Sequence, residues 1–121
     1  MALHTFEELE VWKRACRLSV DVCDAAKNIK PYALQDQISR AAISIPSNIA
    51  EGAERDSEGD FIRFLRIAKG SCAELRTQLY IYKKLSERSG EKLGSLSTYI
   101  EETRGISAML QALIFKVQKN K

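Results

Sequence analysis

Apolar residues recur every three to four positions through four consecutive stretches of this chain, and no useful length of it alternates with a period of two. The longer spacing places apolar side chains on one side of an α-helix, whereas a half-buried strand needs alternation. We therefore predict an all-α chain with helices at approximately 5–29, 33–54, 57–88 and 91–118. Short links between helices make neighbours antiparallel, which gives an up-down-up-down four-helix bundle.

Length and local signals refine this prediction. The 121 residues suit one domain with one core, over 1–121. Thr5 and Glu8 form a capping box for the first helix, and Pro31 ends that helix. Ser57, with an acid three residues on, begins the third helix, and Gly90 suits a left-handed C-cap.

The second helix contains a proline and a run of small and hydroxylated residues, in the segment QDQISRAAISIPSNIAEGAER. Pro46 removes the hydrogen bond to the Ala42 carbonyl and is expected to kink the helix. A water or a nearby side chain should satisfy that carbonyl, the candidates being Ser44, Ser47 and Asn48. One interpretation is a tolerated kink in a curved surface helix. We favour a surface shaped for a second subunit or a ligand, because kinked, polar and apolar features coincide.

At about 100° per residue this helix has three faces. The core face holds Leu34, Ile38, Ala41, Ala42, Ile45, Ile49 and Gly52. A polar stripe lies roughly opposite, formed by Gln37, Arg40, Ser44, Ser47, Asn48, Glu51 and Arg55. Arg40 and Glu51 are too far apart to pair with each other, so each is expected to pair with a neighbouring subunit or helix. Between these faces lies a narrow apolar strip that suggests packing against something else, Ile43, Pro46 and Ala50.

The run RAAISIPSNIAEGAER, with FEELEVWKRA before it and FIRFLRIAKGSCAELRTQL after it, resembles the four-helix-bundle proteins encoded by intervening sequences in bacterial large-subunit rRNA genes. The resemblance covers Phe6 to about Leu113, and its most specific part is Ser44–Gly52. It implies a ring-like homopentamer of four-helix bundles that binds nucleic acid. Members are similar in fold to the accessory protein that assists the reverse transcriptase of diversity-generating retroelements. Candidate subunit-interface or motif residues are therefore Arg40, Ile43, Ser44, Pro46, Ser47, Asn48, Ala50, Glu51 and Gly52.

The net charge of +3 is too small to prove nucleic-acid binding, so the distribution of charge matters more. Basic residues gather in the third and fourth helices, and the candidate phosphate contacts are Arg63, Arg66, Lys69, Arg76, Lys116 and Lys119. The first helix adds Lys13, Arg14 and Arg17. In a monomer these basic residues are ordinary solvated faces. In a ring-like oligomer, each basic stripe is repeated once for every subunit. Without an RNA-reading motif that interleaves aromatics, contact with RNA or DNA should be led by the backbone and weakly sequence-specific.

Catalytic chemistry has little support in this sequence, and we expect neither an enzyme nor a cofactor. His4, the only histidine, precedes the first helix, and Cys16, Cys23 and Cys72 are expected to be small core residues. A zinc site cannot be assembled at the usual spacings. A hydrolase that uses Glu51 is the weakest alternative. Glycines within the predicted helices should mark close helix approaches, namely Gly70, Gly94 and Gly105.

The absence of a long apolar run and of a signal peptide favours a cytoplasmic protein with no membrane contact. Two functions remain open. The first is an oligomeric nucleic-acid-associated protein of the intervening-sequence type. The second is a protein-interaction adaptor, or an accessory factor for a reverse transcriptase, with nucleic acid bound only secondarily.

Overall fold

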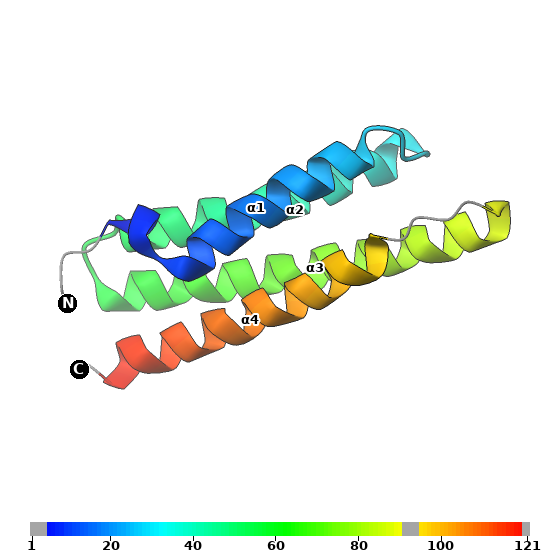
Figure 1. Ribbon diagram of the computed structural model, residues 1–121. Coiled ribbons are helices and arrows are strands. Elements are labelled where there is room, and N and C mark those ends of the chain that lie inside the picture. The colour runs from blue at the N-terminus through cyan, green and yellow to red at the C-terminus, as the bar shows by residue number, and fades with distance from the viewer. Residues whose placement is uncertain (1–4, 91–94, 120–121) are drawn as a thin grey trace.

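The computed structural model describes residues 5–90 and 95–119, which contain four long helices and no strand (Figure 1). A 3-10 turn, η1 (Phe6–Glu8), precedes α1 (Glu10–Ala26), and α2 (Tyr32–Ala53), α3 (Glu58–Ser89) and α4 (Leu96–Lys119) follow. Consecutive helices run antiparallel. The α1–α2 layer packs on the α3–α4 layer, and the start of α1 lies at the same end of the bundle as the end of α4 (Figure 1). The all-α prediction is confirmed.

The core between the layers consists of the apolar residues that the three-to-four spacing selects. On α2, the predicted core face is fully buried except for Leu34, which is half-buried. The side chains with the least exposure come from all four helices and include Val22, Ile38, Leu65, Leu75 and Leu110. Removing this apolar surface from water is the main stabilising contribution to the bundle.

The predicted capping box at Thr5 is wrong. The amide of Glu8 donates to the backbone oxygen of Thr5 at 3.1 Å, and the Thr5 side chain caps nothing. Leu9 is extended and separates this turn from α1.

The other end of α1 also differs, because it stops at Ala26 rather than at 29. Gln35, on α2, explains this end. Its Nε2 donates to the backbone oxygens of Ala26 at 2.8 Å and Lys27 at 2.6 Å. The carbonyls at the end of a helix have no partner within it. Here the Gln35 side chain contacts both of them, and the amide of Ile29 also donates to the Ala26 oxygen at 3.0 Å.

The signals at both ends of α3 act as predicted. The Oγ of Ser57 accepts a hydrogen bond from the amide of Asp60 at 3.1 Å, and Gly90 has a φ of 80°. The left-handed conformation at Gly90 carries no steric penalty because glycine has no Cβ. The predicted start of the last helix, at 91, lies outside the described residues, and the described α4 begins at Leu96.

Helix α2 continues through Pro46 because a neighbouring helix satisfies the orphaned carbonyl. Ser19, on α1, lies with its Oγ 2.7 Å from the backbone oxygen of Ala42 and 2.9 Å from that of Ala15. The expected local donors do not make this contact, so that prediction is wrong. Pro46 is buried, and it follows Ala42 by one helical turn, which places it on the flank of α2 that Ser19 contacts. It is therefore not part of an outer apolar strip.

Two glycines mark close approaches between elements. A Cβ at Gly52 would lie 2.6 Å from the Cβ of Phe64 on α3, and one at Gly105 would lie 2.7 Å from Nη2 of Arg14 on α1. At Gly70, by contrast, nothing lies within 4 Å of such a Cβ, so the prediction of a close approach there is wrong. Gly94 lies outside the described residues.

We predict that Ser19→Ala lowers the free energy of unfolding by about 1–2 kcal/mol, because it leaves the Ala42 carbonyl without a donor. Pro46→Ala returns a backbone N–H to that carbonyl. In a Pro46→Ala background, Ser19→Ala should therefore cost less than about half as much. Urea denaturation of the four chains of this cycle measures both costs, and equal costs in the two backgrounds would contradict the assignment.

We also predict opposite effects at two glycines. Gly52→Ala should lower the free energy of unfolding by about 1–3 kcal/mol, because two β-carbons cannot approach to the distance that the fold requires. Gly70→Ala is the matched control. It adds the same methyl group to an exposed helix interior and should raise stability by about 0.5–1 kcal/mol. Thermal unfolding of both variants compares the signs, and a stabilising Gly52→Ala would refute the close contact.

Candidate nucleic-acid surface

A polar cluster joins α2 to α3 beside the core. The Nδ2 of Asn48 donates to the backbone oxygen of Ser44 at 2.8 Å and to its Oγ at 2.9 Å. The Oγ of Ser44 lies 2.8 Å from the Oγ of Ser71 on α3. Ser44 therefore holds two helices of the same chain together, with Asn48 bonded to it within α2, and Gly52 does so through its close approach to Phe64.

The ions of the α2 stripe pair with residues four positions away, within α2 or just beyond its end. Arg40 lies 2.9 Å from Asp36, and Glu51 lies 3.8 Å from Arg55, both in exposed i, i+4 pairs. Such pairs contribute little to stability. The expected partner on another helix is absent from the described residues. Of the remaining candidates, Ile43 and Ser47 are exposed and Ala50 is half-buried, with Ile43 at 51% exposure.

Arg14 joins α1 to α4 through a bidentate ion pair. Its Nε and Nη2 donate to the two carboxylate oxygens of Glu102 at 2.9 and 2.6 Å, and its Nη1 lies 3.1 Å from the sulfur of Met109. The hydrogen bond to Glu102 raises the pKa of Arg14. The missing Cβ of Gly105 leaves room for this guanidinium. Arg14 is therefore committed to the bundle and is not an open phosphate contact.

Most other cations of the α1–α2 layer also lie beside a carboxylate, in exposed pairs three or four residues apart. Each of the following lies within 4 Å of a carboxylate: Lys13 of Glu10, Lys27 of Asp24, Arg40 of Asp36 and Arg55 of Glu51. On the other layer, the pairs are Arg63 with Asp60, Lys84 with Glu87 and Arg104 with Glu101. Within the described ranges, the cations without a carboxylate partner lie mostly on α3 and α4, and the exceptions are Arg17 and Lys30.

Two of these cations bond to neutral groups where α3 meets α4. The Nζ of Lys69 donates to Oε1 of Gln111 at 2.6 Å, and the Nε of Arg76 donates to Oγ1 of Thr103 at 3.0 Å. These contacts order both side chains but leave their charges uncompensated. Lys83 lies seven residues beyond Arg76, and this spacing places it on the same side of α3.

The same side of the bundle carries exposed aromatics. Tyr80 is 43% exposed, and its hydroxyl oxygen accepts a hydrogen bond from Nη2 of Arg104 at 3.0 Å. Phe115 follows Gln111 by one helical turn and is 58% exposed. Arg66 and Lys119 are also exposed. Arg66 precedes Lys69 by three residues and Lys119 follows Phe115 by four, so each extends the row by about one helical turn. We call this surface the α3–α4 face, formed by Arg66, Lys69, Arg76, Tyr80, Lys83, Arg104, Gln111, Phe115 and Lys119.

The structure brings together four of the six predicted phosphate contacts, namely Arg66, Lys69, Arg76 and Lys119. Arg63 lies elsewhere, with its guanidinium over the ring of Phe64 at 4.5 Å and 3.7 Å from Asp60. Lys116 follows Met109 by seven residues, so it lies on the side of α4 that faces α1.

Sequence reasoning missed four members of the face, Tyr80, Arg104, Gln111 and Phe115, whereas Lys83 was among the basic residues that it counted on the third helix. Each missed residue bridges α3 and α4 or lies one turn from a residue that does. The spacing was visible in the sequence, but the partners that bridge the two helices were not.

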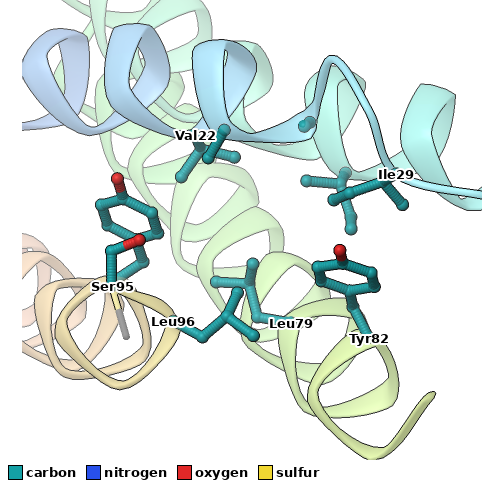
Figure 2. A pocket seen from close by; sticks show the side chains of 10 residues that line it. Val22, Ile29, Leu79, Tyr82, Ser95 and Leu96 are labelled. Carbon is teal, nitrogen blue, oxygen red and sulfur yellow. The ribbon is translucent and has the colours of Figure 1, made fainter. Parts of the chain in front are cut away.

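A small pocket opens between the layers at the other end of the bundle (Figure 2). Val22, Ile29, Leu79 and Leu96 point into it, and the hydroxyl of Tyr82 is directed toward Ile29 (Figure 2). Its enclosed volume is about 20 Å³, which is room for a water molecule and not for a metabolite.

Other chemistry has little to use in the described part of the chain. No group of three metal-binding side chains occurs within residues 5–90 and 95–119. Burial raises the pKa of the Cys72 thiol to about 12, so this side chain stays protonated at neutral pH. Cys16 and Cys23 are half-buried rather than core residues. Among the described helices, none is long and apolar enough to span a membrane.

Comparison with known proteins agrees with this fold. The family model described as 23S rRNA-intervening sequence protein matches residues 7–112, which confirms the resemblance inferred from the sequence. The chain is also similar to a crystal structure of a protein with unknown function from the S23 ribosomal protein family of Bacteroides thetaiotaomicron. The two share 23% identity with a TM-score of 0.76, over 86% of this chain and 97% of that one. No curated protein matches the chain.

Proposed function

Because the chain belongs to the family of 23S rRNA-intervening sequence proteins, we propose that it is a non-enzymatic protein that binds nucleic acid through the α3–α4 face. The observation that carries this proposal is the pairing of charges. Arg66, Lys69, Arg76, Lys83 and Lys119 have no carboxylate partner among the described residues, whereas most cations of the α1–α2 layer have one. A cation that is already neutralised gains little from a phosphate, and an uncompensated one gains more.

The charged residues of this face suit the phosphate backbone rather than base sequence. They lie along two antiparallel helices, with Lys69 and Arg76 bridging to α4. No helix or ribbon projects from the described bundle to enter a groove (Figure 1). Binding is therefore expected to release counterions, to weaken with salt and to vary little with sequence. An rRNA partner would place the protein in the cytoplasm.

The chain is further proposed to assemble into a ring-like homo-oligomer, a pentamer by analogy with the family. Exposed apolar side chains outside the α3–α4 face support a contact between subunits. Ile67, Ile81 and Leu85 are each more than two-fifths exposed, and their spacing places them on one flank of α3. Ile43 adds an apolar side chain on α2. In a ring, the modest charge of each α3–α4 face would be multiplied by the number of subunits.

A second candidate function is a protein adaptor or an accessory factor for a reverse transcriptase. The same flank of α3 favours it, because an apolar row suits a protein partner better than it suits nucleic acid. Under this reading, Ile67, Ile81 and Leu85 would contact another protein in place of a second copy of this chain.

We predict that Arg66→Glu combined with Lys119→Glu weakens binding to every RNA and DNA tested, because two uncompensated phosphate contacts become repulsive. The slope of log affinity against log salt should become shallower by about one per lost contact. Fluorescence anisotropy at several salt concentrations measures both effects. Lys27→Glu combined with Lys30→Glu makes the same change of charge near the α1–α2 turn and should have a smaller effect. An affinity that does not change with salt concentration would contradict the assignment of the face. Equal losses of affinity in the two double variants would also contradict it.

The oligomer predicts a solution mass of about 68 kDa by light scattering, five times the 13.6 kDa of one chain. Ile81→Arg should lower that mass, because a buried, unpaired cation opposes association. Val20→Arg places the same charge at an exposed apolar position of α1 and is the control. Circular dichroism checks that both variants remain helical. A wild-type chain that is monomeric at all concentrations would rule out the ring.

A further inference from the structure

Two exposed aromatic rings lie among the uncompensated cations of the α3–α4 face. Most aromatic side chains of the described chain are covered by the fold: Phe61, Phe64 and Tyr82 are buried, and Phe6 packs edge-on against Trp12. Phe115 is instead 58% exposed and Tyr80 43% exposed. Phe115 makes no ring contact within the described chain, so packing inside the bundle does not explain it.

The contacts between α3 and α4 fix where these rings lie. Lys69 bonds to Gln111 and Arg76 to Thr103, which sets the antiparallel register of the two helices. Phe115 lies one turn beyond Gln111, toward Arg66. Tyr80 lies one turn beyond Arg76, in the opposite direction along the pair. At a rise of 1.5 Å per residue the two rings are about 20 Å apart along the bundle, with Lys69 and Arg76 between them.

We propose that the α3–α4 face binds single-stranded nucleic acid, with unpaired bases stacked on Phe115 and Tyr80 and phosphates held by Arg66, Lys69, Arg76 and Lys119. This inference rests on the proposed nucleic-acid function and specifies that the protein binds the single-stranded form. A basic surface with aromatic rings along it is the arrangement by which proteins hold single strands with little sequence preference.

The preference for single-stranded over double-stranded nucleic acid follows from which part of each the two aromatic side chains can contact. In a duplex the base faces are stacked on one another. An aromatic side chain on the α3–α4 face of the protein can then contact only the sugar-phosphate backbone. An unpaired base presents its face, and either ring can stack on it. The hydrogen bond from Arg104 holds the hydroxyl of Tyr80 at 3.0 Å, which restricts that ring before a base arrives.

Fluorescence anisotropy with three labelled probes of equal length tests this inference: oligothymidine, an abasic strand, and a duplex of thymidine with adenosine. The abasic strand keeps the phosphates and lacks the bases. Wild-type protein should bind oligothymidine about a hundredfold more tightly than the abasic strand at the same salt, because each of the two stacked bases contributes about tenfold. Phe115→Ala should weaken binding to oligothymidine about tenfold and leave the abasic strand, the duplex and the salt slope unchanged. Phe115→Trp should restore the affinity.

Tyr32→Ala is the matched control, because Tyr32 is exposed at the start of α2 and lies outside the α3–α4 face. It should leave all three affinities unchanged. If Phe115→Ala has no effect, or weakens all three probes alike, while Arg66→Glu with Lys119→Glu still weakens binding, the stacking role is wrong and the proposed function stands. If Phe115→Ala lowers the solution mass, the Phe115 side chain is a contact between subunits, and the inference is overturned. If no probe binds wild-type protein, both proposals fail.

Discussion

The course of α2 through the middle of the bundle depends on a hydrogen bond that crosses from α1 to α2. Pro46 would leave a carbonyl without a donor in the middle of a helix that packs on both sides, and Ser19 supplies that donor at 2.7 Å. The bond lets α2 continue through the proline and keeps α1 against it. On its other flank, α2 meets α3 through Ser44 and Ser71 and through the close approach at Gly52. Helix α2 therefore joins the two layers, and α4 completes the core from the far side of α3.

The sequence predicted the features that depend on residues close together in the chain. It did not predict those that depend on contacts between residues far apart in the chain. Spacing along one helix was enough to place Ile38, Ile45 and Ile49 in the core, and the caps at Ser57 and Gly90 depend on residues within one turn. The donor to Ala42, by contrast, lies 23 residues away, and the partner of Arg14 lies 88 residues away. No periodicity carries that information, because it depends on which faces of two helices meet.

The candidate surface was predictable to the same extent. A count of basic residues along α3 treats Arg63 and Lys69 alike. The fold separates them, because Arg63 lies over Phe64 beside Asp60, whereas Lys69 bonds to the neutral amide of Gln111. Pairing across helices decides which charges remain available. It also places Tyr80 and Phe115 beside those charges, which composition alone did not indicate.

The neutral partners of Lys69 and Arg76 have a consequence for conformational entropy. A free lysine or arginine side chain loses much of its rotamer freedom when it grips a ligand, at a cost of about 0.5–1.5 kcal/mol for each side chain. Gln111 and Thr103 already restrict these two side chains in the folded chain. Most of this conformational entropy is therefore lost when the bundle folds. A polyanion that binds later contacts two cations that are already ordered.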